Sequence, residues 1–195
     1  MTLAAVLCCA MITALFTACD NNDNVAETET PTAPTAIEIN LDSLIIKPYL
    51  GFGSSLADVE DYIAEAYAEY DEWGTDYLEP FDQEGGRTYK KEYFNGDFEL
   101  DFFFANADGT DLKLVSFDFF FPIQLEPVIA ELERNGFVNK GEVKFDDYNA
   151  DICYLLLSAD GSIEAQLSSW EKNGGSWALS FQLLDEDDLN HLVKQ

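Results

Sequence analysis

Carboxylates are the chemically versatile side chains that this sequence supplies in quantity. It contains 38 Asp and Glu, 10 Lys and Arg and a single His, so its formal net charge is −28. Two carboxylates about 5–10 Å apart can hydrolyse a glycosidic bond. With so many acids, neither residue type nor spacing singles out such a pair. A carboxylate-based hydrolase is therefore the least favoured of three functional hypotheses.

The other catalytic side chains are scarce. His191 lies near the C-terminus, away from the rigid framework on which a general base must meet its nucleophile. Cys153 lies in an apolar run without a basic residue close in sequence to lower the pKa of its thiol. Outside the N-terminal segment these two residues are too few for a zinc site, and GxSxG, HExxH, GxGxxG and P-loop motifs are absent. We predict no enzymatic activity, no catalytic residue and no cofactor.

A weak calcium candidate lies in the segment 106–111. Asn106, Asp108 and Asp111 offer alternating oxygen ligands, and calcium takes six to eight oxygens. The segment lacks the later Glu of an EF-hand loop and lies where a hairpin turn is expected. Turn formation is the favoured interpretation, with calcium as the alternative.

An acidic stretch at 71–86, interpreted as a loop, is the feature that folding explains least. In and beside it lie four candidate binding residues: Tyr70, Trp73, Tyr77 and Phe81. Aromatic side chains among carboxylates can stack on sugar rings or anchor a protein partner. Alternatively, they cover the edge of a sheet.

A helix followed by antiparallel strands must position these residues. Apolar residues at helical spacing over 56–67, after Ser54 or Ser55 as N-cap, predict an amphipathic helix. Three strand candidates follow: 87–94, 97–105 and 111–121. Asn95-Gly96 is typical of a type I′ turn. Alternation over 97–104 places Phe side chains in the core and Asp97, Glu99 and Asp101 in water, and a parity shift in the third strand suggests a bulge or burial on both faces.

The same pattern then recurs. A second helix is predicted over 125–137, and four strands follow: 141–145, 151–158, 162–171 and 176–184. The turn sequence Ala159-Asp160-Gly161-Ser162 repeats Ala107-Asp108-Gly109-Thr110. We therefore predict an α+β fold of two tandem helix-plus-meander units, with helices packed on sheet faces. The first unit, αβββ, spans 37–123, and the second, αββββ with a short C-terminal helix, spans 124–195.

The N-terminus carries targeting information. Residues 1–18 are apolar and uncharged, as in the core of a signal peptide. An acidic and amide-rich run at 20–24 leads into a Thr- and Pro-rich segment, so 19–36 are predicted to form a disordered tether. Phe16-Thr17-Ala18-Cys19 resembles the lipobox of bacterial lipoproteins. This resemblance implies removal of the leader and lipidation of Cys19.

Two further resemblances concern location and fold. The acidic run is similar to the export tags of Bacteroidota surface lipoproteins, which implies a lipid-anchored domain at the outer membrane, exposed on the cell surface; a periplasm-facing domain is the alternative. The tandem architecture resembles, in topology alone, β-lactamase-inhibitor protein and the small outer-membrane assembly lipoproteins. No diagnostic motif of these families is present, so no functional residue is carried over.

The charge and the resemblances together predict a binding role. A net charge of −28 disfavours nucleic acid, because binding there depends on Lys and Arg releasing counterions from phosphates. The first functional hypothesis is a non-enzymatic interaction module for another envelope or secreted protein. The alternative is a surface glycan-binding accessory protein that uses the aromatic residues of 70–81.

Overall fold

The protein is described from a computed structural model. The structure describes residues 35–42, 44–69, 74–75, 77–83, 86–144, 150–170 and 177–184, all within the unit Pro31–Gln195. The predicted leader, Cys19 and most of the predicted tether lie outside the described residues, as do His191 and the predicted C-terminal helix. No helix among the described residues combines the length and the apolar character needed to cross a membrane.

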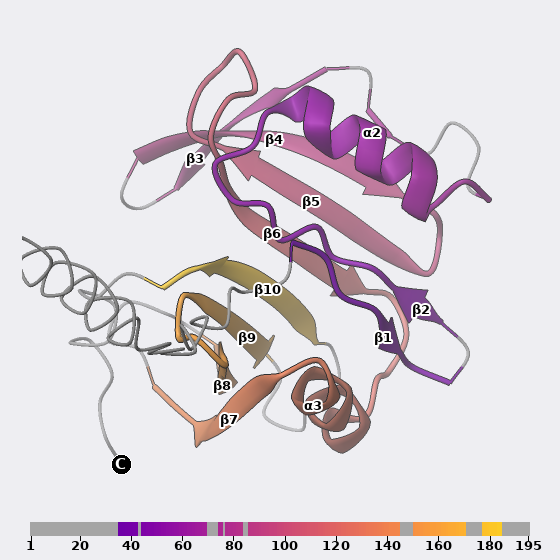
Figure 1. Ribbon diagram of the computed structural model, residues 1–195, viewed down its shortest axis with the longest axis vertical. Coiled ribbons are helices and arrows are strands. Elements are labelled where there is room, and N and C mark those ends of the chain that lie inside the picture. Colours follow the sequence, from indigo (N-terminus) through magenta and orange to yellow (C-terminus); the bar gives the residue numbers. More distant parts are fainter. Residues whose placement is uncertain are drawn as a thin grey trace, which may run out of the picture. The chain divides into compact units, whose positions relative to one another are not determined.

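Eight antiparallel strands form one sheet (Figure 1). Their order across the sheet is β3 (Glu79–Gln83), β4 (Gly86–Phe94), β5 (Phe98–Phe104), β6 (Leu112–Phe119), β10 (Ala178–Leu183), β9 (Ile163–Ser169), β8 (Ile152–Ser158) and β7 (Phe137–Glu142). A separate small hairpin joins β1 (Ile39–Asn40) to β2 (Ile45–Ile46), and the described residues form two helices, α2 (Leu56–Ala66) and α3 (Leu125–Arg134). The predicted α+β class is confirmed, with β-structure dominant.

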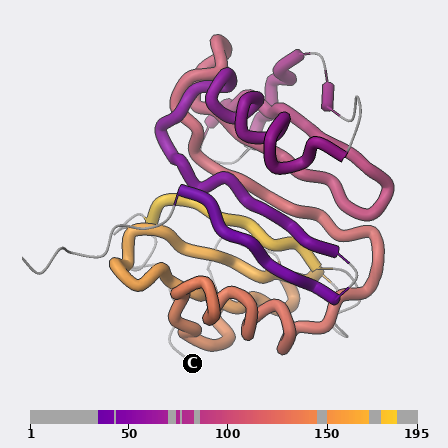
Figure 2. The backbone as a smooth tube through the Cα atoms, turned by 45° about the vertical axis from the view of Figure 1, so that its right-hand side comes forward, coloured from indigo at the N-terminus to yellow at the C-terminus, as the bar shows by residue number. Residues whose placement is uncertain are grey.

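Both helices and the small hairpin lie on one side of the sheet. α2 crosses β4 and β5, α3 lies beside β7, and the hairpin runs between the helices (Figures 1 and 2). The other side of the sheet faces away from all three elements. The two faces of the sheet therefore have different surroundings, although the same strands supply both.

The start of α2 is fixed by a capping box. The Ser55 hydroxyl accepts a hydrogen bond from the backbone N–H of Asp58, and the Asp58 carboxylate accepts one from the backbone N–H of Ser55 at 2.9 Å. These bonds satisfy N–H groups that the first helical turn leaves free. Val59 and Ile63 are buried against the sheet. The predicted helix and its N-cap are confirmed.

The second helix ends earlier than predicted, and the next strand begins earlier. After the C-cap Asn135, Gly136 adopts φ +88°, a conformation that favours glycine. The chain turns at once, and Phe137 pairs with Ser158 at the start of β7. The strand predicted at 141–145 was therefore misplaced. Its true position at the sheet edge includes an irregularity between Asn139 and Gly141.

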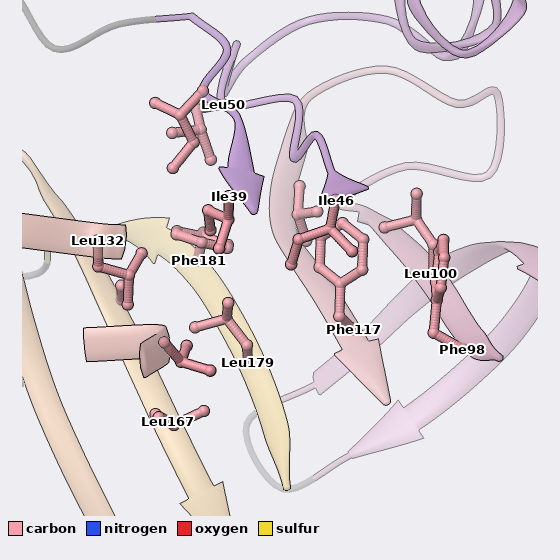
Figure 3. Packing of buried hydrophobic residues seen from close by; sticks show 14 of the residues in the cluster. Ile39, Ile46, Leu50, Phe98, Leu100, Phe117, Leu132, Leu167, Leu179 and Phe181 are labelled. Atoms are coloured by element: carbon pink, nitrogen blue, oxygen red, sulfur yellow. The ribbon is translucent and has the colours of Figure 1, made fainter. Parts of the chain in front are cut away.

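The hydrophobic core lies between the sheet and the elements that cover it. From β5, four side chains are wholly buried as predicted: Phe98, Leu100, Phe102 and Phe104. Figure 3 shows Ile39 of β1 beside Phe181 and Ile46 of β2 beside Phe117. The small hairpin, which the sequence analysis did not predict, thus covers the centre of the sheet where the two helices leave it open. The expected irregularity in β6 is a register shift against β5 between Phe103 and Phe104.

The turn between β4 and β5 differs from the predicted type I′. Asn95 does not have positive φ; the turn is centred on Gly96 and Asp97, of which only Gly96 has positive φ, +93°. The Asn95 side chain accepts hydrogen bonds from the N–H groups of Asp97 and Phe98, at 2.9 and 3.1 Å. This side-chain bonding is how Asn stabilises a turn without entering the left-handed region itself.

Candidate binding face

Side chains on the sheet face opposite the helices are unusually polar for strands inside a sheet. Strand alternation assigns them to this face, which we call the polar face. Its polar residues on β4, β5, β6, β9 and β10 are Lys90, Glu92, Glu99, Asp101, Ser116, Asp118, Glu164, Gln166, Ser168, Ser180 and Gln182. One continuous row crosses five strands in register: Glu92, Asp101, Ser116, Ser180 and Gln166.

Lys90 lies at the centre of a carboxylate cluster on this face. Its Nζ is 2.7 Å from Glu92, 3.2 Å from Glu99 and 3.3 Å from Asp101. The hydrogen bonds and charges of these partners raise the pKa of Lys90 against the opposing effect of burial. The lysine therefore stays protonated and acts as the cluster's own cation.

Asp101 is the buried member of this cluster. It is only 5% exposed, and its Oδ1 has no hydrogen-bond partner among the residues that the structure describes. Burial, reinforced by Glu99 and Glu92, raises the pKa of Asp101 to about 8 despite the proximity of Lys90. The prediction that Asp101 faces water was wrong, because β5 is an interior strand with Lys90 and Phe103 among the side chains around this position.

The cluster has the donor set of a cation site. The carboxylate oxygens of Glu92, Glu99 and Asp101 all lie within 4.8 Å of one another, close enough to share a metal ion. The ammonium group of Lys90 already contacts all three. The three carboxylates therefore favour a positive charge at this position. A metal ion would have to displace the Lys90 ammonium group.

The second half of the polar face is held by hydrogen bonds. Glu164 is nearly fully buried and accepts hydrogen bonds from the side-chain amides of Gln166, at 2.8 Å, and Gln182. Ser168 donates to the sulfur of Cys153 at 3.4 Å. Burial raises the pKa of the Cys153 thiol, which disfavours the nucleophilic thiolate.

The structure places two of the four predicted binding residues and leaves two outside its description. Phe81 lies in the edge strand β3, and its ring contacts Phe103 with 5.3 Å between centroids. Tyr77, just before β3, is 62% exposed. Tyr70 and Trp73 lie outside the described residues. The prediction of a loop throughout 71–86 was wrong, because 79–83 pair with β4; Phe81 thus contributes to the sheet edge.

The weak calcium candidate forms a hydrogen-bonded turn. Asp108 Oδ1 accepts from the N–H and the hydroxyl of Thr110, at 3.1 and 2.7 Å, and the Asn106 amide donates to the same hydroxyl at 3.0 Å. Asp111 pairs with Lys113 at 2.9 Å. These contacts give each side chain a structural use in or beside the turn, which supports the favoured interpretation.

A set of exposed aromatic residues was missed by the sequence analysis. Phe94 and Phe120 are each 52% exposed, and their ring centroids lie 5.4 Å apart. Trp170, which follows β9, is 49% exposed. Each continues the alternation of acids and polar residues on the polar face, a signal that becomes visible only once the register between strands is known.

Comparison with known proteins adds no family: no family model, no curated protein and no solved structure matches the chain.

Proposed function

We propose that the chain is a cell-envelope lipoprotein, anchored through Cys19, whose α+β domain binds another protein through the polar face. The observation that carries the proposal is an imbalance of charge. At the described polar-face positions of β4, β5 and β6, one cation, Lys90, stands against four acids: Glu92, Glu99, Asp101 and Asp118. The imbalance remains even though Asp101, with a pKa of about 8, is largely protonated at neutral pH. A basic surface on a partner complements this face and speeds encounter with it.

The proposed tandem repeat is supported by two matching turns. Gly109 and Gly161 both adopt φ +73°. Asp108 accepts from the N–H of Thr110 at 3.1 Å, and Asp160 accepts from the N–H of Ser162 at 3.0 Å. The first turn joins β5 to β6, the third and fourth strands after α2, and the second turn joins β8 to β9, the second and third strands after α3. We infer two units placed side by side, in each of which a helix is followed by four strands: α2 by β3–β6 and α3 by β7–β10. The predicted αβββ pattern of the first unit was wrong, because β3 adds a strand where a loop was expected.

The partner proposal is tested by co-purification from the organism that makes the protein. The full-length chain carries a C-terminal affinity tag and is extracted in mild detergent at low and moderate salt. We expect one protein at near-equal stoichiometry, with less recovered as salt rises. The double variant Glu92→Gln/Glu99→Gln should reduce recovery. Asp61→Asn/Glu65→Gln, which removes the same charge from the exposed side of α2, should not. Empty lanes at both salts contradict the proposal.

The lipid anchor has a separate test. The mass of the protein purified from membranes should match a lipidated chain that begins at Cys19, and Cys19→Ser should release the protein from the membrane fraction. An unmodified chain that starts at Met1 contradicts the lipoprotein proposal without affecting the test of the polar face.

Glycan binding is the second candidate, favoured by the exposure of Tyr77 and Phe81 at the β3 edge. Aromatic faces that reach solvent can stack on sugar rings. This function predicts binding to an oligosaccharide on a glycan array that changes little with salt. Trp73→Ala or Phe81→Ala should abolish the signal, whereas Ile45→Ala, at an exposed position of β2, should leave it unchanged.

A further inference from the structure

One end of the polar face combines aromatic rings with carboxylates. Phe94 and Phe120 form an exposed pair beside the β4–β5 turn. Trp170 extends the same alternation from β9, with β10 between it and Phe120. Two strand spacings separate these two backbones, about 10 Å. This aromatic frame of Phe94, Phe120 and Trp170 offers ring faces on which a planar group such as a guanidinium can stack.

Two acids lie inside this frame. The strand register places Phe94 opposite Glu99, and Glu99 opposite Asp118. Such directly opposed side chains are about 5 Å apart at Cβ. Glu99 shares Lys90 with two other carboxylates. Asp118 makes no hydrogen bond or ion pair with any residue that the structure describes, and it is half-buried.

The lack of a counter-charge is reflected in the titration of Asp118. Burial, together with the charge of Glu99, raises its pKa, and Lys90 offsets this only in part. A half-buried carboxylate in this position destabilises the folded protein when it is ionised. A cation supplied from outside removes that penalty and gains two favourable contacts, one with the carboxylate and one with the aromatic rings.

We propose that this end of the polar face, made of Phe94, Glu99, Asp118, Phe120 and Trp170, binds an arginine side chain of a partner protein. The inference rests on the proposed function and specifies where the partner binds. Arginine fits better than lysine, because its planar guanidinium can stack on an aromatic ring while its N–H groups bond a carboxylate. Lysine offers a compact, strongly hydrated charge that matches Asp118 alone. A nucleic acid or an anionic lipid surface is repelled by both acids.

The test measures peptide binding to the full-length protein in detergent. The probe is a capped hexaarginine peptide, compared with capped hexalysine by calorimetry. We expect hexaarginine to bind the more tightly. Asp118→Asn should weaken hexaarginine about tenfold, equivalent to about 1.4 kcal/mol, and Phe120→Ala about three- to fivefold. Phe94→Ala is a second aromatic variant that should weaken hexaarginine binding as Phe120→Ala does. Unchanged near-ultraviolet circular dichroism confirms that each variant is folded.

Matched controls separate a site from a general field of negative charge. Asp82→Asn removes an exposed acid from β3, and Ile45→Ala removes an exposed apolar side chain from β2; neither should change hexaarginine binding. Equal affinity for the two peptides, or equal weakening by Asp82→Asn and Asp118→Asn, overturns the inference. So does a Trp fluorescence response to cellohexaose without any response to hexaarginine, which indicates a glycan site instead.

The outcome is distinguishable from that of the proposed function. If a protein co-purifies with the chain and its recovery survives both Asp118→Asn and Phe120→Ala, the binding function stands and this site is overturned. If hexaarginine binding depends on both residues while no protein co-purifies, the site stands and the proposed partner function fails.

Discussion

Replacing Asp101 by Asn should stabilise the protein at alkaline pH, although the change removes a carboxylate from a cluster of ion pairs. Asp101 contacts Lys90 through Oδ2 at 3.3 Å, while its Oδ1 meets no hydrogen-bond partner in the described part of the chain. After the substitution Lys90 still contacts Glu92 at 2.7 Å and Glu99 at 3.2 Å. The variant therefore loses a buried negative charge, but Lys90 keeps two partners. Removing one partner of a buried ion pair is costly when the other charge is left unpaired, and that does not happen here.

The magnitude follows from proton linkage. The pKa of Asp101 rises from 3.8 to about 8 on folding, so between these values the folded protein binds a proton that the unfolded chain releases. Stability then falls as pH rises through this window, by at most about 1.4 kcal/mol per pH unit. Because Asn cannot ionise, the Asp101→Asn variant does not lose stability in this way as the pH rises. Between about pH 5 and pH 8, the unfolding free energy of Asp101→Asn relative to the unaltered protein should increase by about 2–4 kcal/mol. The upper value is the linkage limit for three pH units.

Urea unfolding followed by Trp fluorescence at the two pH values measures this difference. Asp82→Asn is the control, because Asp82 forms an exposed bidentate pair with Arg87 at 2.6 and 2.9 Å, and its substitution should alter stability little and equally at both pH values. If Asp101→Asn is destabilising by the same amount at both pH values, the carboxylate is ionised and paired with Lys90 throughout, and the reasoning fails.

Three further stability predictions use the same unfolding assay. Lys90→Met should cost about 2–3 kcal/mol and more at alkaline pH, where its carboxylates are ionised and left without a cation; a cost that does not depend on pH contradicts this. Ser55→Ala should cost about 1 kcal/mol by removing the cap of α2, and Ser55→Asp should retain most of the stability. Gly109→Ala should cost about 2 kcal/mol or more, because its φ is +73° and the new Cβ lies 2.7 Å from Leu56 Cβ. Gly161→Ala has the same φ with nothing within 4 Å, so it should cost only the backbone strain, about 1 kcal/mol; equal costs at the two glycines rule out the steric explanation.

The alternation of β5 could be read from the sequence, but the environment of one face could not. Phe98, Leu100 and Phe102 were placed in the core correctly, and the same alternation put Asp101 on the opposite face. Alternation does not say whether water reaches that face. Whether water reaches it depends on the neighbouring side chains of Lys90 and Phe103. That these residues are neighbours is known only from the register of the strands.

The edge strand β3 escaped detection for a different reason. Its five residues, Glu79–Gln83, include Pro80 and two acids, which is the composition of a loop. An edge strand tolerates proline and charge because one side of its backbone needs no hydrogen-bond partner. Its formation depends on pairing with Gly86–Lys90 of β4, a tertiary effect that local composition does not contain.

The acids of the polar face are best explained by a role in binding and not by a role in folding. The main hydrophobic cluster lies on the other side of the sheet, beneath α2, α3 and the small hairpin, so its packing does not require carboxylates at the positions of Asp101 and Asp118. Their raised pKa values mean that ionisation weakens the fold. Residues that break a local rule at a cost in stability are expected where binding needs them. Asp118→Asn therefore separates the two explanations: an acid retained for structure loses stability when neutralised, whereas one retained for binding gains stability above its pKa and loses affinity for the arginine peptide.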